Sequence, residues 1–133
     1  MVIPAFVLDT SAAMALFLQE KEGLLVEADL KEIINSNGQI FVPPLFWFEV
    51  GNTLVSAFNR KRITMEEIYG IEFDMSELPI VTDPVPDTAI RSRIREIAIR
   101  KNLTFYDASY VELSQRLQIP LKSFDKKVLA VIN

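Results

Sequence analysis

Four acidic residues stand beside expected strand ends and helix starts, and the chain offers few other groups that do chemistry. They are Asp9, Glu49, Asp107 and Asp125. The 133 residues include no histidine and no cysteine, which excludes Ser-His-Asp triads, HExxH metalloproteases, thiolate nucleophiles, iron–sulfur clusters and cysteine zinc sites. Acid–base or metal chemistry must therefore rest on carboxylates. Carboxylates suit hard cations such as Mg²⁺ or Mn²⁺, and those cations suit phosphate substrates.

Each of these acids also has a purely structural explanation. Asp9 precedes Thr-Ser-Ala, where an Asp caps a helix well, and Asp125 follows a short expected strand and can cap the last helix. The pattern Thr104-x-x-Asp107 is typical of a capping box. Glu49 lies at a border between aromatic and polar residues, which is a common place for a glutamate. For each residue taken alone, the structural and the functional explanations both stay open.

Short apolar runs alternate with helical patterns along the whole chain, which predicts a parallel sheet covered by helices on both faces. A chain of this length fits one domain and needs no disulfide or metal to fold. We therefore expect residues 1–133 to form a single α/β domain around a short central sheet. The expected strands are 5–9, 40–42, 79–82 and 120–123; the expected helices are 12–18, 22–36, 45–59, one that begins after Thr64, one capped by Asp87 or Thr88 that runs to 100, 104–118 and 126–132.

The expected topology brings the four acids towards one edge of the sheet. Asp9 and Asp125 end expected strands, whereas Glu49 and Asp107 lie early in expected helices. In an open parallel sheet such positions converge outside the carboxyl ends of the strands. Clustered like charges are unfavourable without a cation, and nearby helix N-termini help to keep the acids ionised. The pattern therefore predicts a metal site.

Four segments resemble, in chain order, the motifs of PIN-domain ribonucleases. Their sequences are VLDTSAA at 7–13, PPLFWFEVGN at 43–52, LTFYDASY at 103–110 and PLKSFD at 120–125. The similarity covers essentially the whole chain and is closest to the small VapC-type toxins of toxin–antitoxin pairs. This resemblance implies a PIN-like fold and an endoribonuclease that depends on Mg²⁺ or Mn²⁺, is usually a homodimer and is inhibited by a cognate antitoxin.

The resemblance also assigns roles to individual residues. The catalytic acids it implies are Asp9, Glu49, Asp107 and Asp125, and the main metal ligands among them are Asp9 and Asp107. Water and phosphate oxygens would fill the remaining metal positions. The hydroxyl of the family's Thr-x-Asp motif is matched here by Ser123, which is a mild departure. The other polar helpers that bind substrate or support the acids are Thr10, Ser11 and Asn52.

Charge is unevenly distributed along the chain. The net charge of −4 argues against binding of nucleic acid by bulk charge alone. Residues 66–87 hold seven acids and no base, whereas residues 88–127 hold nine bases and four acids. Arg60, Lys61 and Arg62 form a second basic group. We expect both basic regions to contact an RNA backbone, although each also fits a solvated helix face.

Aromatic residues precede two of the acids. Phe46, Trp47 and Phe48 stand before Glu49, and a place in the core is favoured over a dimer contact. The pair at 105–106, Phe-Tyr, precedes Asp107 and has the shape to stack on an unpaired base. Burial in the core is the favoured interpretation for that pair as well.

Two other classes of protein fit parts of the pattern. One is a catalytically silent binding module with the same fold. The other is a phosphorelay receiver domain, which needs an acid pair at the first strand and an acceptor Asp near mid-chain, whereas no Asp occurs between Asp29 and Asp74. No apolar run is long enough to span a bilayer, and the first eight residues have no basic segment before them and no cleavage site after them. We therefore expect a soluble, cytoplasmic protein without a membrane partner.

Overall fold

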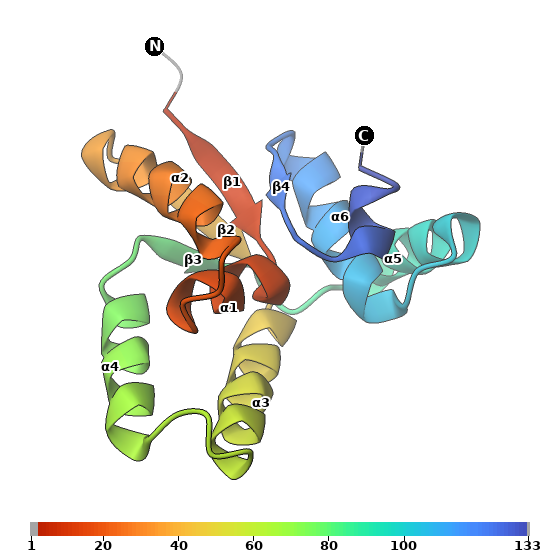
Figure 1. Cartoon of the computed structure of the whole chain (residues 1–133). Helices are drawn as coiled ribbons and strands as arrows, with labels where there is room; N and C mark the ends of the chain where they lie inside the picture. The colour runs from red at the N-terminus through yellow and green to blue at the C-terminus, as the bar shows by residue number, and fades with distance from the viewer. Residues whose placement is uncertain (1–2, 133) are drawn as a thin grey trace.

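A four-stranded parallel sheet organises residues 3–132, the part of the chain that the computed structural model describes (Figure 1). The strands are β1 (Ala5–Leu8), β2 (Gln39–Val42), β3 (Ile80–Thr82) and β4 (Leu121–Lys122), in the order β3-β2-β1-β4. The helices are α1 (Thr10–Phe17), α2 (Gly23–Asn35), α3 (Leu45–Asn59), α4 (Met65–Ser76), α5 (Thr88–Lys101), α6 (Phe105–Leu117) and α7 (Lys126–Leu129). The predicted α/β class and parallel sheet are confirmed.

The central strand β1 aligns the ends of its neighbours. Val7 pairs in parallel with Phe41 of β2 on one side and with Leu121 of β4 on the other. The chain leaves β1 at Asp9 and β4 at Ser123, so these residues stand at the same edge of the sheet. That edge collects the polar residues that follow the strands.

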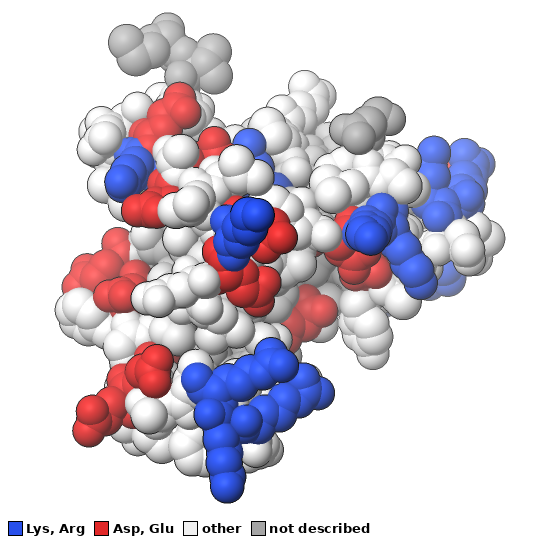
Figure 2. Space-filling view, viewed as in Figure 1, with Lys and Arg blue, Asp and Glu red and all other residues white. Residues whose placement is uncertain are grey.

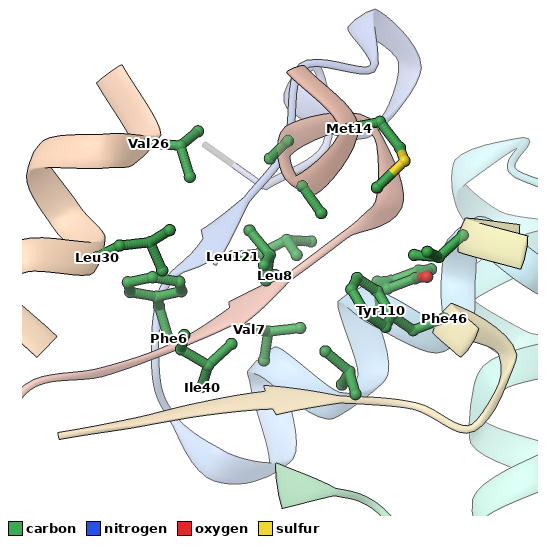
Figure 3. Close-up of a cluster of buried hydrophobic side chains, with 14 of the residues drawn as sticks. Phe6, Val7, Leu8, Met14, Val26, Leu30, Ile40, Phe46, Tyr110 and Leu121 are labelled. Atoms are coloured by element: carbon green, nitrogen blue, oxygen red, sulfur yellow. The ribbon is translucent and has the colours of Figure 1, made fainter. Parts of the chain in front are cut away.

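Both faces of β1 are buried, which explains its run of apolar residues without alternation. Phe6 and Val7 point to opposite faces, and both are buried. Figure 3 shows Phe6 beside Val26 and Leu30 of α2 on one face, while Val7 lies on the face towards Tyr110 of α6. The two helical layers therefore hold β1, and the residue that follows it, in a fixed position.

Helix α1 begins two residues earlier than predicted, at Thr10 instead of residue 12. Asp9 has an extended backbone and caps the helix, because its Oδ1 accepts a hydrogen bond from the N–H of Ala12 at 3.0 Å. Thr10 and Ser11 are the first two helical residues. Their hydroxyls are thereby free to serve other partners at the edge of the sheet.

Helices α3 and α4 project from the sheet and are joined by a turn at 60–64 (Figure 1). The predicted bounds of α3 and the predicted capping box of α4 are confirmed: the side chain of Thr64 accepts from the N–H of Glu67, and the Glu67 carboxylate accepts from the N–H of Thr64, each at 3.1 Å. In residues 3–132 there is no helix long and apolar enough to cross a membrane.

The last helix is shorter than predicted. It was expected to reach residue 132, but α7 ends at Leu129. The N–H of Val131 bonds to the carbonyl of Val128, three residues back, so a tight turn closes the helix there. The short α7 leaves its N-terminus, capped by Asp125, at the edge of the sheet.

Candidate active site

Asp9 is the most buried acid at the edge of the sheet. Only 6% of its surface is exposed, and its Oδ1 accepts from the Ser11 hydroxyl at 2.7 Å as well as from the N–H of Ala12. In residues 3–132 no Lys or Arg forms an ion pair with it. A buried carboxylate without a cationic partner is costly, and such groups are common at functional sites.

Ser11 joins the end of β1 to the segment that follows β4. Its hydroxyl accepts from the N–H of Phe124 at 2.9 Å and lies 3.5 Å from the hydroxyl of Ser123. The Ser123 hydroxyl in turn accepts from the N–H of Asp125 at 3.0 Å. Two serines therefore place Asp125 next to Asp9, across a separation of more than a hundred residues in sequence.

Glu49 is held by two hydroxyl groups from other helices. Its Oε1 accepts from the Tyr110 hydroxyl at 2.6 Å and from the Thr10 hydroxyl at 3.1 Å. The Tyr110 and Thr10 oxygens are themselves 3.1 Å apart. The three side chains, from α1, α3 and α6, form a closed triangle that leaves Oε2 of Glu49 without a protein partner in the described residues.

Tyr110 is the residue of this site that sequence reasoning missed. It is 3% exposed, and burial, followed by its hydrogen bond to Glu49, raises its pKa, so its hydroxyl stays protonated and donates. It stands three residues after Asp107, which places both on one face of α6. That spacing was a usable signal, although a buried tyrosine is usually a core residue.

Asp107 lies in the first turn of α6, where Thr104 caps the helix. The Thr104 hydroxyl accepts from the N–H of Asp107 at 3.0 Å, so the backbone, and not the carboxylate, makes the capping contact. The Asp107 carboxylate forms no ion pair in the described part of the chain, and hydrogen bonding with the Thr104 side chain acts to lower its pKa. The Thr104 cap that the sequence predicted is present, without the reciprocal contact to the Thr104 N–H that completes a capping box.

The acids at the edge of the sheet interact electrostatically. Burial raises the pKa of Asp9, and Asp125 raises it further, against the hydrogen bonds of Ser11 and Ser123 that lower it. Burial also raises the pKa of Asp107, again with a contribution from Asp125, whereas Lys127 acts to lower it. Asp125 therefore lies within reach of both other aspartates, as predicted. These raised pKa values mean that added positive charge would be favourable here.

The comparison with known families identifies the family to which this fold belongs. The family model described as PIN domain matches residues 6–132. The chain belongs to the PIN domain family. PIN domains are usually nucleases and typically use divalent metal ions. This membership removes the alternative of a receiver domain.

The same fold occurs in a solved structure. The crystal structure of PAE2754 from Pyrobaculum aerophilum is similar, with a TM-score of 0.71 and 23% sequence identity over 96% of this chain and 79% of that chain. At this identity the similarity supports the fold alone. No curated protein matches the sequence.

The donor atoms at this edge of the PIN domain fit a hard divalent cation. All are carboxylate or hydroxyl oxygens, and Asp9 and Asp107 each have a raised pKa that a cation would relieve. Within residues 3–132, no three acidic side chains are arranged to hold one ion together. The fit is therefore to an ion held by two carboxylates, with water or phosphate at its other positions.

Asn52 lies apart from this cluster. It is exposed on α3 and lines a separate hollow with Thr53, Ser56, Arg60 and Arg62. The structure thus brings together seven of the eight residues that the sequence singled out, and places the eighth three residues along α3 from Glu49. The seven are Asp9, Thr10, Ser11, Glu49, Asp107, Ser123 and Asp125.

The aromatic residues beside the site are less buried than expected. Phe46 is fully buried, as predicted, but Phe48 is 78% exposed, because two residues along a helix lead to a different face. Phe105 and Tyr106 are exposed as well, and Tyr106 is 61% exposed. They are the first two residues of α6, and the buried positions of this helix begin at Ala108. Trp47 is also exposed, at 36%, so the interpretation of Trp47, Phe48, Phe105 and Tyr106 as core residues was wrong.

Replacing Asp9 with Asn should leave the metal-free protein at least as stable as the wild type at pH 7. The folded-state pKa of Asp9 is raised above 3.8, so its stabilising contribution is fully present below pH 3.8 and is lost as the pH rises through the folded pKa. Asn removes this titration and still caps the helix. Urea unfolding in EDTA should show the advantage of the variant at pH 7 disappear as the pH falls towards 3.8.

The variant Asp9→Ala separates this effect from capping. It loses the hydrogen bond to Ala12 and should cost about 1 kcal/mol more than Asn at each pH. If the stability of Asp9→Asn relative to the wild type did not change between pH 3.8 and pH 7, while Asp9→Ala still cost about 1 kcal/mol, Asp9 would act only as a structural cap and the cluster would carry no electrostatic strain.

Proposed function

We propose that this PIN domain is a divalent-metal-dependent endoribonuclease that hydrolyses RNA phosphodiester bonds. The observation that carries the proposal is the group of Asp9, Asp107 and Asp125 at one edge of the sheet, where burial first, and then the charge of Asp125, raise the pKa of Asp9 and of Asp107. Carboxylates that destabilise one another in the apo protein are suited to a cation, and the chain has no histidine or cysteine to do other chemistry.

In this proposal each residue has a separate task. Asp9 and Asp107 would hold Mg²⁺ or Mn²⁺, and Glu49 and Asp125 would hold metal-bound waters or a second ion. When bound, the ion would activate a water and neutralise charge on the phosphate. The hydroxyls of Ser11 and Ser123 orient Asp9 and Asp125, while those of Thr10 and Tyr110 orient Glu49. Fixed acceptors of this kind reduce the reorganisation that the reaction requires.

We further propose that the protein is the cytoplasmic toxin of a toxin–antitoxin pair, with an antitoxin protein and a second copy of the chain as partners. Large apolar side chains on the surface of several helices support protein partners, because solvent-exposed groups of this size are common at interfaces. The most exposed on α2, α3 and α4 are Leu24, Leu25, Phe48, Tyr69 and Phe73.

The proposed activity is tested by incubating structured and single-stranded RNAs with the protein in Mg²⁺, in Mn²⁺ or in EDTA. We expect cleavage with either metal and none in EDTA. Unchanged cleavage in EDTA would contradict the metal dependence. Binding without cleavage under all metal conditions would instead favour a silent binding module with the same fold.

Tyr110→Phe should lower cleavage by about 10-fold, the usual cost of removing a residue that orients a catalytic group. The change removes only the hydroxyl that donates to Glu49 at 2.6 Å. Because the hydroxyl acts through Glu49, the same change in a Glu49→Gln background should have a much smaller effect. The loss should appear in kcat and not in KM.

Tyr69→Phe is the matched control, since Tyr69 is an exposed tyrosine of α4. It should leave both kinetic constants unchanged. An equal loss from Tyr110→Phe with and without Glu49 would show that Tyr110 acts on the fold or on another group.

A further inference from the structure

Two hollows adjoin beside α3 and connect the candidate site to the far end of that helix. One, of about 580 Å³, is lined by Thr10 and Ser11 of the site and extends to Thr53 and Glu20. The other, of about 370 Å³, begins at the same two residues, Thr53 and Glu20, and continues to Arg60. Because the same two residues line both, the hollows lie side by side along the helix, and we refer to them together as the channel.

The wall of this channel on α3 is mostly polar and continues from Glu49. Thr53, Ser56 and Arg60 line the hollows with Asn52 beside them, and Glu49 precedes Thr53 by four residues. This spacing places them on one face of the helix. In the described residues, the side chains of Asn52 and Ser56 have no hydrogen-bond partner, so their polar groups are available to a ligand.

The channel ends at three consecutive exposed cations, Arg60, Lys61 and Arg62, of which both arginines line it. None of the three forms an ion pair within residues 3–132. The turn that carries them is fixed, because the N–H groups of Lys61 and Arg62 each bond back to a carbonyl of α3 at 2.9 Å. Figure 2 shows basic side chains gathered at the lower end of the molecule, where Figure 1 places this turn.

We propose that this channel binds the sugar–phosphate backbone of a single-stranded RNA segment on one side of the scissile bond. The inference rests on the proposed nuclease function. It adds the path of the bound strand, along α3, and the place where its contact with the protein ends, at Arg60 and Arg62. Arg60 and Arg62 bind a phosphate, while Asn52 and Ser56 hydrogen-bond the backbone between that phosphate and the site. Fixed, unpaired arginines beside unpartnered polar groups favour a phosphate ligand over an apolar one.

The opposite wall suits ribose more than phosphate. Glu20 repels phosphate oxygens, but its carboxylate accepts hydrogen bonds from 2′-hydroxyl groups. The strand therefore lies with its phosphates towards α3 and its riboses towards Glu20. This arrangement favours RNA over DNA, since DNA has no 2′-hydroxyl to donate.

The length of the helix sets how far the strand extends. The eleven residues from Glu49 to Arg60 correspond to a rise of about 16 Å. The phosphate at the arginines is therefore separated from the scissile phosphate by a few nucleotides. An RNA with fewer nucleotides than this on the channel side of the scissile bond cannot contact the candidate site and the arginines at the same time.

The test is charge reversal of the channel arginines, measured by RNA binding in EDTA and by cleavage in Mg²⁺. Arg60→Glu with Arg62→Glu should weaken binding of single-stranded RNA at least about 10-fold and reduce its salt slope by about 2. The sequence also predicts an RNA contact for the basic region 88–127, but Arg93 and Arg95 of that region line neither hollow. The matched control is therefore Arg93→Glu with Arg95→Glu, two exposed arginines of α5 without ion pairs in the described residues. It changes the net charge equally and should have a much smaller effect.

Substrate trimming locates the contact. The RNA is shortened one nucleotide at a time from the 5′ side and, in a second series, from the 3′ side. In one series only, the shortening should abolish the difference in RNA affinity between the wild type and Arg60→Glu/Arg62→Glu. Arg60→Gln with Arg62→Gln, checked by thermal melting, repeats the test with a smaller disturbance of the helix end. The expected binding loss persists in this variant.

The outcomes separate this inference from the proposed function. Wild-type RNA binding that depends on Arg60 and Arg62, without any cleavage, would retain the channel and overturn the nuclease. Cleavage and binding that are indifferent to both arginines, or affected equally by the α5 control, would overturn the channel. The channel would also be overturned if substitution of the arginines changed only the melting temperature, or only the binding of a protein partner.

Discussion

Asp9→Asn and Asp107→Asn should each lower the rate of RNA cleavage at least about 100-fold, because positioning of a metal supplies several kcal/mol of transition-state stabilisation. Asn matches Asp in size and also caps a helix, so the fold should remain. Each substitution removes one negative charge from the acidic cluster. A bound cation would balance that charge in the wild type. Single-turnover rates at fixed Mg²⁺ measure the effect, and thermal melting checks the fold.

Asp74→Asn is the matched control for both variants. Asp74 is an exposed acid of α4 and forms no ion pair in residues 3–132. It changes the net charge by the same amount and should leave the rate unchanged. Full activity of both site variants, with the control equally active, would show that the cluster is not the catalytic centre.

Much of the fold could be predicted because local signals dominate it. Pro44 before an apolar helix, and the Thr64–Glu67 capping box, mark the starts of α3 and α4 within one residue. The run Ala5–Leu8 has no alternation, and it is indeed the central strand buried on both faces. These signals depend on neighbours a few residues away, which a single sequence displays.

The candidate site was predictable for a different reason. Parallel strands place their carboxyl ends at one edge, so Asp9 and Asp125 could be brought together without knowledge of any side-chain contact. The partner of Glu49 could not be found in this way. Tyr110 lies 61 residues further along the chain, and nothing local distinguishes its hydroxyl from that of a packed tyrosine.

A buried ion network was also invisible in the sequence. Glu112 is 1% exposed on α6, and Arg116 donates to both of its oxygens, at 2.7 and 3.1 Å. Arg116 also donates to Asp83, the residue after β3, at 2.6 and 3.3 Å. These hydrogen bonds, first that to Glu112, raise the pKa of Arg116. The network fixes α6, which carries Asp107 and Tyr110, against the edge of the sheet.

Arg116→Leu should lower the free energy of unfolding by about 3 kcal/mol, because it leaves the buried charge of Glu112 without a partner. Urea unfolding measures the loss, with the slope expected to stay constant if only stability changes. Adding Glu112→Met to this variant should recover most of the stability, since an apolar pair of similar volume replaces a buried ion pair at little cost. Recovery of this kind identifies the unpaired carboxylate as the cause of the loss.

Lys31→Leu provides the matched control, since Lys31 pairs with Glu27 at the same i,i+4 spacing on the exposed face of α2. Loss of a solvated pair should cost less than about 1 kcal/mol. If Arg116→Leu cost no more than this control, the Asp83–Arg116–Glu112 network would not hold α6. If the stability fell as expected while cleavage below the melting temperature stayed at the wild-type rate, the network would stabilise the fold without setting the positions of Asp107 and Tyr110. We expect both stability and rate to fall, because one helix carries the network and two residues of the site.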